Sequence, residues 1–163
     1  MFKSQTYGKL EFNEIPAKLK DWYEKNKKYE SDFSIVIGTD SQNFSDTKMV
    51  SVITMICEGH GGIFFYEVSR QDLIKDVRTK LHVETNASLT LADNLIKMLE
   101  EKEFEELFLN CHFSIHVDAG HSTYGKTKDL IPELIGWIKA CGYECQVKPD
   151  SYAASSIADK ISK

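Results

Sequence analysis

The sequence has no long hydrophobic run: about 18 consecutive apolar residues, the length that a membrane-spanning helix needs, occur nowhere in it. Its start, MFKSQTYGKL, lacks the apolar core behind a basic end that marks a secretory signal. These two absences exclude a helical membrane protein. They predict a cytoplasmic protein that has no membrane partner.

Signatures of zinc sites and of serine hydrolases are missing as well. The 4 cysteines form no CxxC pair, whereas structural zinc sites are built from tight pairs of ligands. No GxSxG turn is present, which disfavours a hydrolase that uses a serine nucleophile. We interpret the cysteines as small, buried, apolar side chains.

Positive charge is also in short supply. The chain carries 20 Lys and Arg against 25 Asp and Glu, which gives a net charge of −5. This balance argues against a protein that coats nucleic acid without specificity, because such binding comes from the neutralisation of phosphates. It does not exclude a nuclease, because carboxylates that hold metal ions make a site acidic while nearby lysines contact phosphates.

The sequence does contain the pattern of one α/β domain, which we place at 1–163. Apolar runs predict three closely spaced strands, then helices that alternate with two further strands, and an extra N-terminal helix. The first three strands should be antiparallel, and the last two should run parallel to the first. The expected strands are 33–40, 48–57, 63–69, 113–118 and 143–148, and the expected helices are 14–28, 69–99, 127–141 and 151–162.

Two of the expected strands end in an aspartate. Asp40 follows the apolar run FSIVIGT, and Asp118 follows FSIHV. Each could simply start a loop, but ligands of open α/β sheets bind beyond the carboxyl ends of parallel strands. If the two strands are adjacent and parallel, Asp40 and Asp118 meet at one edge of the sheet. His116 shares a strand face with Asp118, and we interpret it as a core histidine with satisfied polar atoms.

Glu84 is an acid in an unusual place on the long expected helix. At about 100° per residue it falls on the apolar stripe that also holds Leu81 and Leu91. A buried acid is costly unless it is paired or bound to a cation. The alternative is a break near Asn86 that turns Glu84 to solvent, since about thirty residues is long for one helix in a small domain.

The C-terminal segment supplies two more candidate acids. Asp159 lies on a helix of small residues that suits close packing. Asp150 follows Pro149 and has a simpler explanation as a helix cap. Asp159 is therefore the better candidate ligand, and Asp150 is the competing one.

Carboxylates that converge in this way suit Mg²⁺ or Mn²⁺, which prefer hard oxygen ligands. Two such ions about 4 Å apart can activate a water and stabilise the leaving oxygen during cleavage of a phosphodiester. The predicted cofactor is therefore Mg²⁺ or Mn²⁺, with two ions expected.

The strand order and three motifs resemble a known family. IGTDSQ (37–42), HVDAGHSTYGKT (116–127) and KPDSYAASSIADK (148–160) are similar to segments of the YkuK family of bacterial ribonuclease H-like proteins. The resemblance implies a ribonuclease H-like fold, with a five-stranded mixed sheet in the order 3-2-1-4-5 flanked by helices. It also implies a two-metal acidic site, with these members: Asp40, Glu84, Asp118 and Asp159 as catalytic ligands, and Asp150 as a further metal ligand.

The function that the resemblance implies is that of a metal-dependent nuclease or phosphodiester hydrolase acting on RNA or DNA. The chain has Asp-Ser-Gln at 40–42 where typical ribonuclease H enzymes have Asp-Gly-Ser, which argues against an RNA–DNA hybrid as substrate. The alternative function is a catalytically inactive module of the same fold that binds nucleic acid or a protein partner. Candidate contacts to a substrate follow from position: Ser41, Gln42, His121, Lys126 and Lys148.

Overall fold

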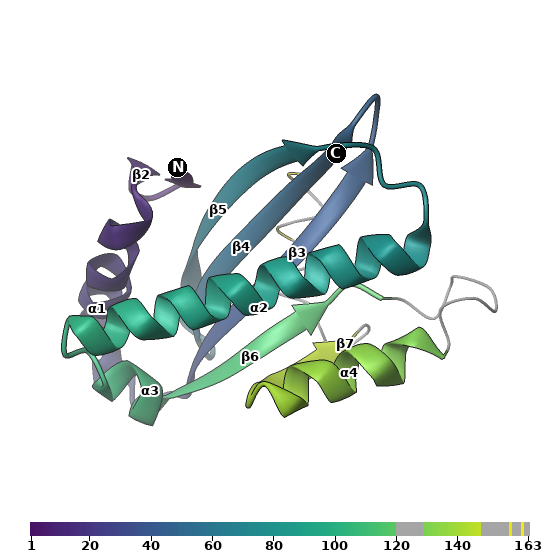
Figure 1. Ribbon diagram of the computed structural model, residues 1–163. Helices are drawn as coiled ribbons and strands as arrows, with labels where there is room; N and C mark the ends of the chain where they lie inside the picture. Colours follow the sequence, from purple (N-terminus) through teal and green to yellow (C-terminus); the bar gives the residue numbers. More distant parts are fainter. Residues whose placement is uncertain (120–128, 148–156, 158–160, 162–163) are drawn as a thin grey trace.

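The computed structural model describes residues 1–119, 129–147, 157 and 161. Seven strands form one mixed sheet in the order β2-β1-β5-β4-β3-β6-β7, and helices pack against it (Figure 1). The strands are β1 (Phe2–Ser4), β2 (Gly8–Leu10), β3 (Phe33–Asn43), β4 (Thr47–Cys57), β5 (Gly61–Gln71), β6 (Cys111–Val117) and β7 (Glu144–Val147). The helices are α1 (Ile15–Asn26), α2 (Val77–Glu101), α3 (Glu106–Asn110) and α4 (Leu130–Ala140), with 3-10 turns at Phe12–Glu14 and Lys27–Tyr29. No helix among the described residues is long and apolar enough to cross a membrane.

The expected α/β architecture is confirmed, and the five expected strands lie in the expected order, β5-β4-β3-β6-β7. β4 pairs antiparallel with both β3 and β5, whereas β6 runs parallel to β3, and β7 runs parallel to β6. The expected count of five strands is wrong, because the sheet has seven.

The two additional strands form an N-terminal hairpin. β1 pairs antiparallel with β2 and joins β5 where Lys3 lies opposite Tyr66. Phe2 and Leu10 are partners across the hairpin, are only 3% and 6% exposed, and belong to the main core. Strands of three residues show too little alternation to be recognised in a sequence, which explains why the hairpin was not predicted.

The long helix α2 begins later than the sequence pattern suggested. Its first residue is Val77, and the Asp76 carboxylate caps it by accepting a hydrogen bond from the backbone N–H of Thr79. The expected start at residue 69 is wrong, because β5 continues to Gln71 in register with β4. Residues 69–71 therefore belong to β5, although the local capping pattern predicted that they start the helix.

α2 is continuous across the sheet (Figure 1), so the alternative of a break near Asn86 is wrong. Asn86 is exposed, and its modest helix propensity is outweighed by the packing of the buried stripe on both sides of it. The buried stripe of α2 consists of Leu81, Glu84, Thr85, Ser88, Leu89, Leu91, Ala92, Leu95 and Leu99.

The two faces of the sheet are packed differently. One face is covered by α1, α2, α3 and α4, whose apolar residues join those of the strands in the main core; we call it the helical face. The opposite face carries Val50 and Val52, against which Ile157 and Ile161 pack; we call it the Val50 face. Successive residues of a strand point to opposite faces, so the register assigns every strand residue to one of them.

Substituting Phe2 by alanine tests whether the N-terminal hairpin is an integral part of the domain. We expect Phe2→Ala to lower the free energy of unfolding by about 3 kcal/mol, because a buried aromatic ring is lost and a cavity remains. Urea denaturation measures the change. Lys9→Ala, an exposed change in the same hairpin, should stay within about 0.5 kcal/mol of the parent protein, and a similarly small effect for Phe2→Ala would contradict the prediction.

Candidate functional site

The residues around Asp40 alternate between the two faces of the sheet. The Thr39 hydroxyl accepts a 2.9 Å hydrogen bond from the Ser88 hydroxyl of α2, which places Thr39 on the helical face. Asp40 is the register partner of Val50 and therefore lies on the Val50 face. Ser41 returns to the helical face. The residue of β3 that meets α2 here is therefore Ser41, and Asp40 points away from that helix.

Glu84 is the acid that α2 places over this end of β3. Its side chain is only 6% exposed and accepts a 2.5 Å hydrogen bond from the Ser41 hydroxyl. The position of Glu84 on the buried stripe is therefore confirmed, and the alternative in which it turns to solvent is wrong. The Ser41 hydroxyl is bonded to Glu84 and buried, so it positions this carboxyl and is not presented to a substrate.

The pKa of Glu84 is raised to about 8, in the first place by burial. The negative charges of Asp40 and Asp118 raise it as well. The hydrogen bond from Ser41 and the positive charge of Lys80 act in the opposite sense but do not cancel the effect of burial. Glu84 is therefore neutral near pH 7 in the metal-free protein.

Asp118 follows β6 at the same end of the sheet. The last register pair of the parallel strands β3 and β6 is Thr39 with Val117, so Asp40 and Asp118 are the next residues of two neighbouring strands. Both act on the pKa of Glu84 through their charge, which requires that both lie near it. Three of the predicted acids thus lie close together, although they come from β3, α2 and the end of β6.

Short hydroxyl side chains let α2 approach the sheet beside these acids. The Thr39 and Ser51 hydroxyls lie 3.0 Å apart, and Ser88 extends the chain of hydrogen bonds to the helix. Thr39 and Ser51 were not predicted as part of the site. They are small polar residues within apolar strands, and this sequence pattern could have indicated that they belong to it. A small crevice at this end is lined by Thr39, Glu84, Thr85, Ser88, His116, Val117 and Asp118.

His116 is a buried histidine whose polar atoms are not satisfied. The side chain is only 5% exposed. No acceptor or donor lies at hydrogen-bonding distance and angle from either ring nitrogen. Burial lowers the pKa of His116 to about 4, while the side chain of Gln146, its register partner on β7, has a small opposing effect. The interpretation of His116 as a core histidine is confirmed by its burial, and Gln146 is the side chain near enough to bond to it, although neither nitrogen meets strict hydrogen-bond geometry.

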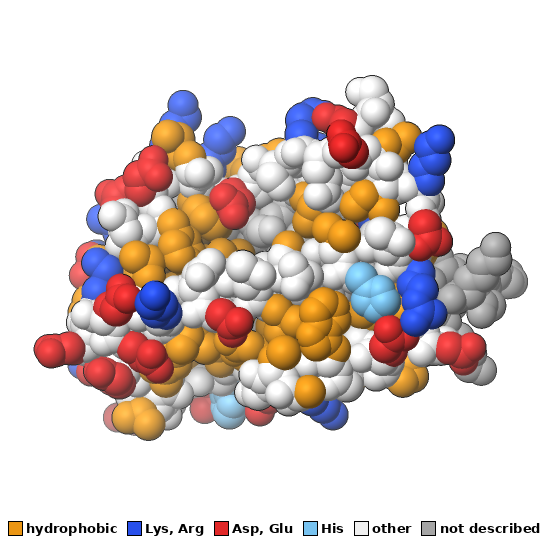
Figure 2. Space-filling model, viewed as in Figure 1, with side chains coloured by type: hydrophobic (Ala, Val, Ile, Leu, Met, Phe, Trp, Pro, Cys, Tyr) orange, Lys and Arg blue, Asp and Glu red, His pale blue; other side chains and the backbone are white. Residues whose placement is uncertain are grey.

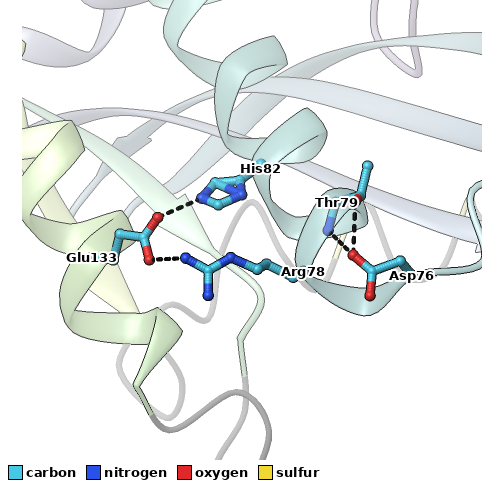
Figure 3. A network of polar contacts seen from close by, with 5 residues as sticks. All are labelled: Asp76, Arg78, Thr79, His82 and Glu133. Atoms are coloured by element: carbon cyan, nitrogen blue, oxygen red, sulfur yellow. Dashed lines mark hydrogen bonds and ion pairs between the residues drawn. The ribbon is translucent and has the colours of Figure 1, made fainter.

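A network of ion pairs joins α2 to α4 beside the site (Figure 3). The Glu133 carboxylate accepts a 2.6 Å hydrogen bond from Arg78 and lies 2.9 Å from Nε2 of His82. Asp76 accepts hydrogen bonds from both the backbone N–H and the hydroxyl of Thr79. Exposed pairs of this kind stabilise by only about 0.2–1 kcal/mol each, so their contribution is chiefly to fix the start of α2.

Charge is distributed unevenly along α2. Near its N-terminal end the sequence supplies Lys75, Arg78 and Lys80. Acidic side chains gather over its C-terminal end and α3 (Figure 2). These acids are Glu100, Glu101, Glu103, Glu105 and Glu106. A polyanion is therefore repelled from the α3 end and is better accommodated at the end that holds Glu84.

On the Val50 face, a polar row lies next to Asp40. Gln42, Lys48 and Arg70 are register partners across β3, β4 and β5, and they lie two residues beyond the row of Asp40 and Val50. The side-chain oxygen of Gln42 is buried and has no hydrogen-bond partner. Lys48 donates a 2.5 Å hydrogen bond to the backbone carbonyl of Ile161. Arg70 forms a 2.6 Å ion pair with Asp46, so Lys48 is the cation of this row on the strand next to Asp40.

The remaining predicted residues lie outside the described residues: Asp150 and Asp159 among the acids, and His121, Lys126 and Lys148 among the substrate contacts. A further sequence signal falls in the same region. GHSTYGKT (120–127) has the GxxxxGK[ST] spacing of a phosphate-binding loop and lies between β6 and α4.

The donor set fits a divalent metal ion that prefers oxygen ligands. The buried Glu84 carboxyl, crowded by Asp40 and Asp118, is an arrangement in which a cation would relieve repulsion. Within residues 1–119, 129–147, 157 and 161, no three His, Cys, Asp or Glu side chains are grouped so that they could hold an ion by themselves. A complete metal site therefore requires adjustment of these side chains or ligands from the rest of the chain.

The chain matches a family model and a known protein over most of its length. The family model described as Ribonuclease H-like matches residues 14–163, so the hairpin β1–β2 precedes the matched region. The uncharacterized protein YkuK of Bacillus subtilis (strain 168) is 30% identical over 174 aligned residues, which cover 100% of this chain and 97% of that protein. No solved structure matches the chain.

The raised pKa of Glu84 predicts how stability depends on pH in metal-free buffer. The folded protein holds this carboxyl neutral up to about pH 8, whereas in the unfolded chain it ionises near its ordinary value of 4.5. The stability that comes from the neutral form is thus fully present below about pH 4.5 and is lost as the pH rises through 8.

We expect Glu84→Gln to remove this loss, because the amide cannot ionise. At about pH 8.5 the variant should be more stable than the parent protein by on the order of 3–5 kcal/mol, with little difference near pH 4. Denaturation at both pH values with a chelator present is the measurement. Glu100→Gln, on the exposed side of the same helix, serves as the control; equal pH profiles for Glu84→Gln and the parent protein would refute the assignment.

Proposed function

This chain belongs to the ribonuclease H-like family, and on that premise we propose that it is a nuclease or phosphodiester hydrolase that depends on Mg²⁺ or Mn²⁺. The observation that carries the proposal is the burial of Glu84 beside Asp40 and Asp118, where the parallel pairing of β3 with β6 ends while β3 itself continues to Asn43. A buried acid surrounded by two further acids destabilises the fold, so its presence is best explained by a cationic ligand.

In this proposal Asp40 and Asp118 are the principal metal ligands and Glu84 is a ligand of one ion. Asp159 is the ligand of the second ion, with Asp150 as the competing candidate. When bound, a pair of such ions supplies an activated water and charge stabilisation for the leaving oxygen of a phosphodiester. The chain's own contribution is to hold the three carboxylates in place from β3, β6 and α2.

Ser41 has a positioning role in this site. Its hydroxyl donates to Oε1 of Glu84, and Glu84 also lines the crevice. Ser88 and Thr39 hold the same turn of α2 against β3, so the carboxyl has little freedom to move. Preorganised ligands of this kind reduce the reorganisation that the reaction requires.

The proposed substrate is a nucleic acid, RNA or DNA. Gln42 lies in the polar row with Lys48 and Arg70, close to Asp40, which supports it as a contact to the substrate backbone. His121, Lys126 and Lys148 remain proposed contacts from the segments after β6 and β7. The Asp-Ser-Gln sequence at 40–42, in place of Asp-Gly-Ser, favours a substrate other than an RNA–DNA hybrid.

The second candidate function is a module of the same fold that binds nucleic acid or a protein without cleaving it. One finding favours it: the described acids are not grouped to hold a metal ion by themselves. The two functions predict different outcomes, because only a nuclease requires the metal and the acids for turnover.

Removal of either strand-end acid tests the proposed nuclease. We expect Asp40→Asn and Asp118→Asn each to lower the rate of Mn²⁺- or Mg²⁺-dependent cleavage by at least about 100-fold, since loss of even an indirect metal partner costs about 10–100-fold. Cleavage of single-stranded RNA, single-stranded DNA, both duplexes and an RNA–DNA hybrid is measured in parallel, which also identifies the substrate.

Glu58→Gln is the matched control for these variants. Glu58 is exposed in the turn after β4, at the opposite end of the sheet from Asp40, and its substitution should leave the rate unchanged. Variants of Asp40 and Asp118 that cleave as well as the parent protein would exclude the catalytic site. Binding of nucleic acid without metal-dependent cleavage by the parent protein would support the second candidate function.

A further inference from the structure

Exposed apolar side chains gather at the end of the sheet that holds Glu84. Among the described residues, seven large hydrophobic side chains are exposed, and three of them lie in two loops at this end. These three, which we call the Phe44 patch, are Phe44 (49% exposed), Leu73 (39%) and Val77 (47%). Single exposed apolar residues are common on soluble proteins, whereas a group of them marks a surface that binds a partner.

Hydrogen bonds join the two loops that carry the Phe44 patch. Phe44 lies in the turn between β3 and β4, and Leu73 lies in the loop that leads from β5 into α2 (Figure 1). The Asn43 side chain donates a 2.7 Å hydrogen bond to the backbone carbonyl of Ile74, and the backbone N–H of Ile74 donates a 2.8 Å bond to the Thr47 hydroxyl. The two loops therefore form one continuous surface.

The Phe44 patch lies close to the crevice. Ser41 contacts Glu84, which lines the crevice, and Phe44 comes three residues after Ser41, about 10 Å along an extended chain. Val77 comes seven residues before Glu84 on α2, about 10 Å along the helix and about 20° from it around the helix axis. Both β3 and α2 thus lead from the contact between Ser41 and Glu84 to the patch.

Positive charge accompanies these apolar side chains. Lys75 is exposed and lies between Leu73 and Val77 in the sequence. Lys80 lies on α2 between Val77 and Glu84, and its positive charge acts on the Glu84 carboxyl. Neither lysine forms an ion pair with any residue that the structure describes. Both are therefore available to an anionic partner.

Most of the acids in the two loops are already engaged. Asp46 forms a 2.6 Å ion pair with Arg70, and Asp76 caps the start of α2. Asp72 is the remaining acid, against two lysines. The other end of α2 carries the acidic side chains that repel a polyanion, so a polyanion is the partner whose charge suits the Phe44 patch.

An exposed aromatic ring beside lysines is typical of proteins that bind single-stranded nucleic acid. Such proteins stack bases on aromatic side chains while cations contact the phosphates. A duplex gains nothing from the ring, because its bases are already stacked on one another and paired. At about 3.4 Å per nucleotide, the distance of about 10 Å from the crevice to Phe44 spans about three nucleotides.

We propose that the Phe44 patch binds single-stranded nucleic acid, with Phe44 stacked on a base about three nucleotides from the phosphate at the crevice and with Lys75 on the backbone. This inference rests on the proposed function, because it takes the crevice as the place of cleavage. It narrows the substrate from nucleic acid in general to single strands.

Fluorescence anisotropy of the full-length protein with a chelator present measures binding without cleavage. The probes are labelled RNA and DNA single strands of about 12 nucleotides, and the duplexes of the same sequence. The parent protein should bind a single strand more tightly than the duplex. Phe44→Ala should weaken single-strand binding by about 5–150-fold, the value of one stacked base, and duplex binding by less than about 2-fold.

Tyr29→Ala is the matched control for Phe44→Ala. Tyr29 is exposed to a similar degree (44%), but it stacks on His60 at the opposite end of the sheet, so the variant should bind like the parent protein. Phe44→Trp keeps an aromatic face and should retain the affinity. Equal binding of single strand and duplex by the parent protein, or unchanged single-strand binding by Phe44→Ala, overturns the inference.

A scan of the single strand with abasic sites locates the stacked base. Removal of the base that contacts Phe44 should weaken binding by the parent protein but not by Phe44→Ala, because the variant has already lost that contact. Equal losses for the two proteins at every abasic position would show that Phe44 stacks on no base, and they overturn the inference.

The salt dependence of binding tests Lys75. Loss of one phosphate contact on a single strand lowers the slope of log affinity against log salt concentration by about 0.7. Lys75→Ala should show this change, whereas Lys97→Ala, an exposed lysine near the acidic end of α2, should keep the slope of the parent protein. An unchanged slope in Lys75→Ala refutes the contact of Lys75 with the backbone.

Analytical ultracentrifugation tests whether a second copy of this chain covers the Phe44 patch instead. The parent protein and Phe44→Ala should have the same oligomeric state. A parent dimer that dissociates in Phe44→Ala would make the patch an interface between copies and overturn the inference.

The outcomes separate this inference from the proposed function. Metal-dependent cleavage that needs Asp40 and Asp118 but is the same in Phe44→Ala, on single strands and duplexes alike, refutes the inference and leaves the nuclease intact. Single-strand binding that depends on Phe44, without cleavage of any nucleic acid, supports the inference and refutes the nuclease.

Discussion

The burial of the Glu84 carboxyl against β3 is the interaction on which this end of the molecule depends. A helix that carries an acid on its buried stripe can pack only where the sheet offers a donor, and Ser41 supplies one. The hydroxyls of Thr39 and Ser88 continue the contact, so polar groups replace apolar packing along two turns of α2. A buried polar cluster of this kind is stable only while each of its polar groups keeps a hydrogen-bond partner. Burial and the charges of Asp40 and Asp118 raise the pKa of Glu84, so ionising this carboxyl costs free energy in the folded protein.

The acids reach the site from different sides of the sheet. Glu84 comes from the helical face, whereas Asp40 lies on the Val50 face and Asp118 follows the end of β6. They can approach one another because the parallel pairing of β3 and β6 ends at Thr39 and Val117. On the Val50 face the same register brings Lys48 of β4 close to Asp40, whereas Arg70 of β5 pairs with Asp46.

Much of the fold could be predicted because long apolar runs identify strands and helices whatever their surroundings. β3, β4 and β5 followed this rule. The ends of two apolar runs pointed to Asp40 and Asp118, and the apolar stripe of the long helix pointed to Glu84. Short or competing signals failed. The hairpin β1–β2 was too short to recognise, and the start of α2 moved because pairing with β4 extended β5 to Gln71. Capping patterns in the local sequence carry no information about a partner strand that is distant in the sequence.

By itself the sequence determined the α/β class, the order of the five central strands and the family, because periodicity and strand-end residues are local properties. Only the tertiary structure decided which face each side chain occupies. It assigned Ser41 to Glu84, turned Asp40 to the opposite face and buried His116 between β3 and β7. The physical reason is the two-residue period of a strand: a side chain's neighbours depend on which strands pair and in what register, and that pairing joins residues far apart in the chain.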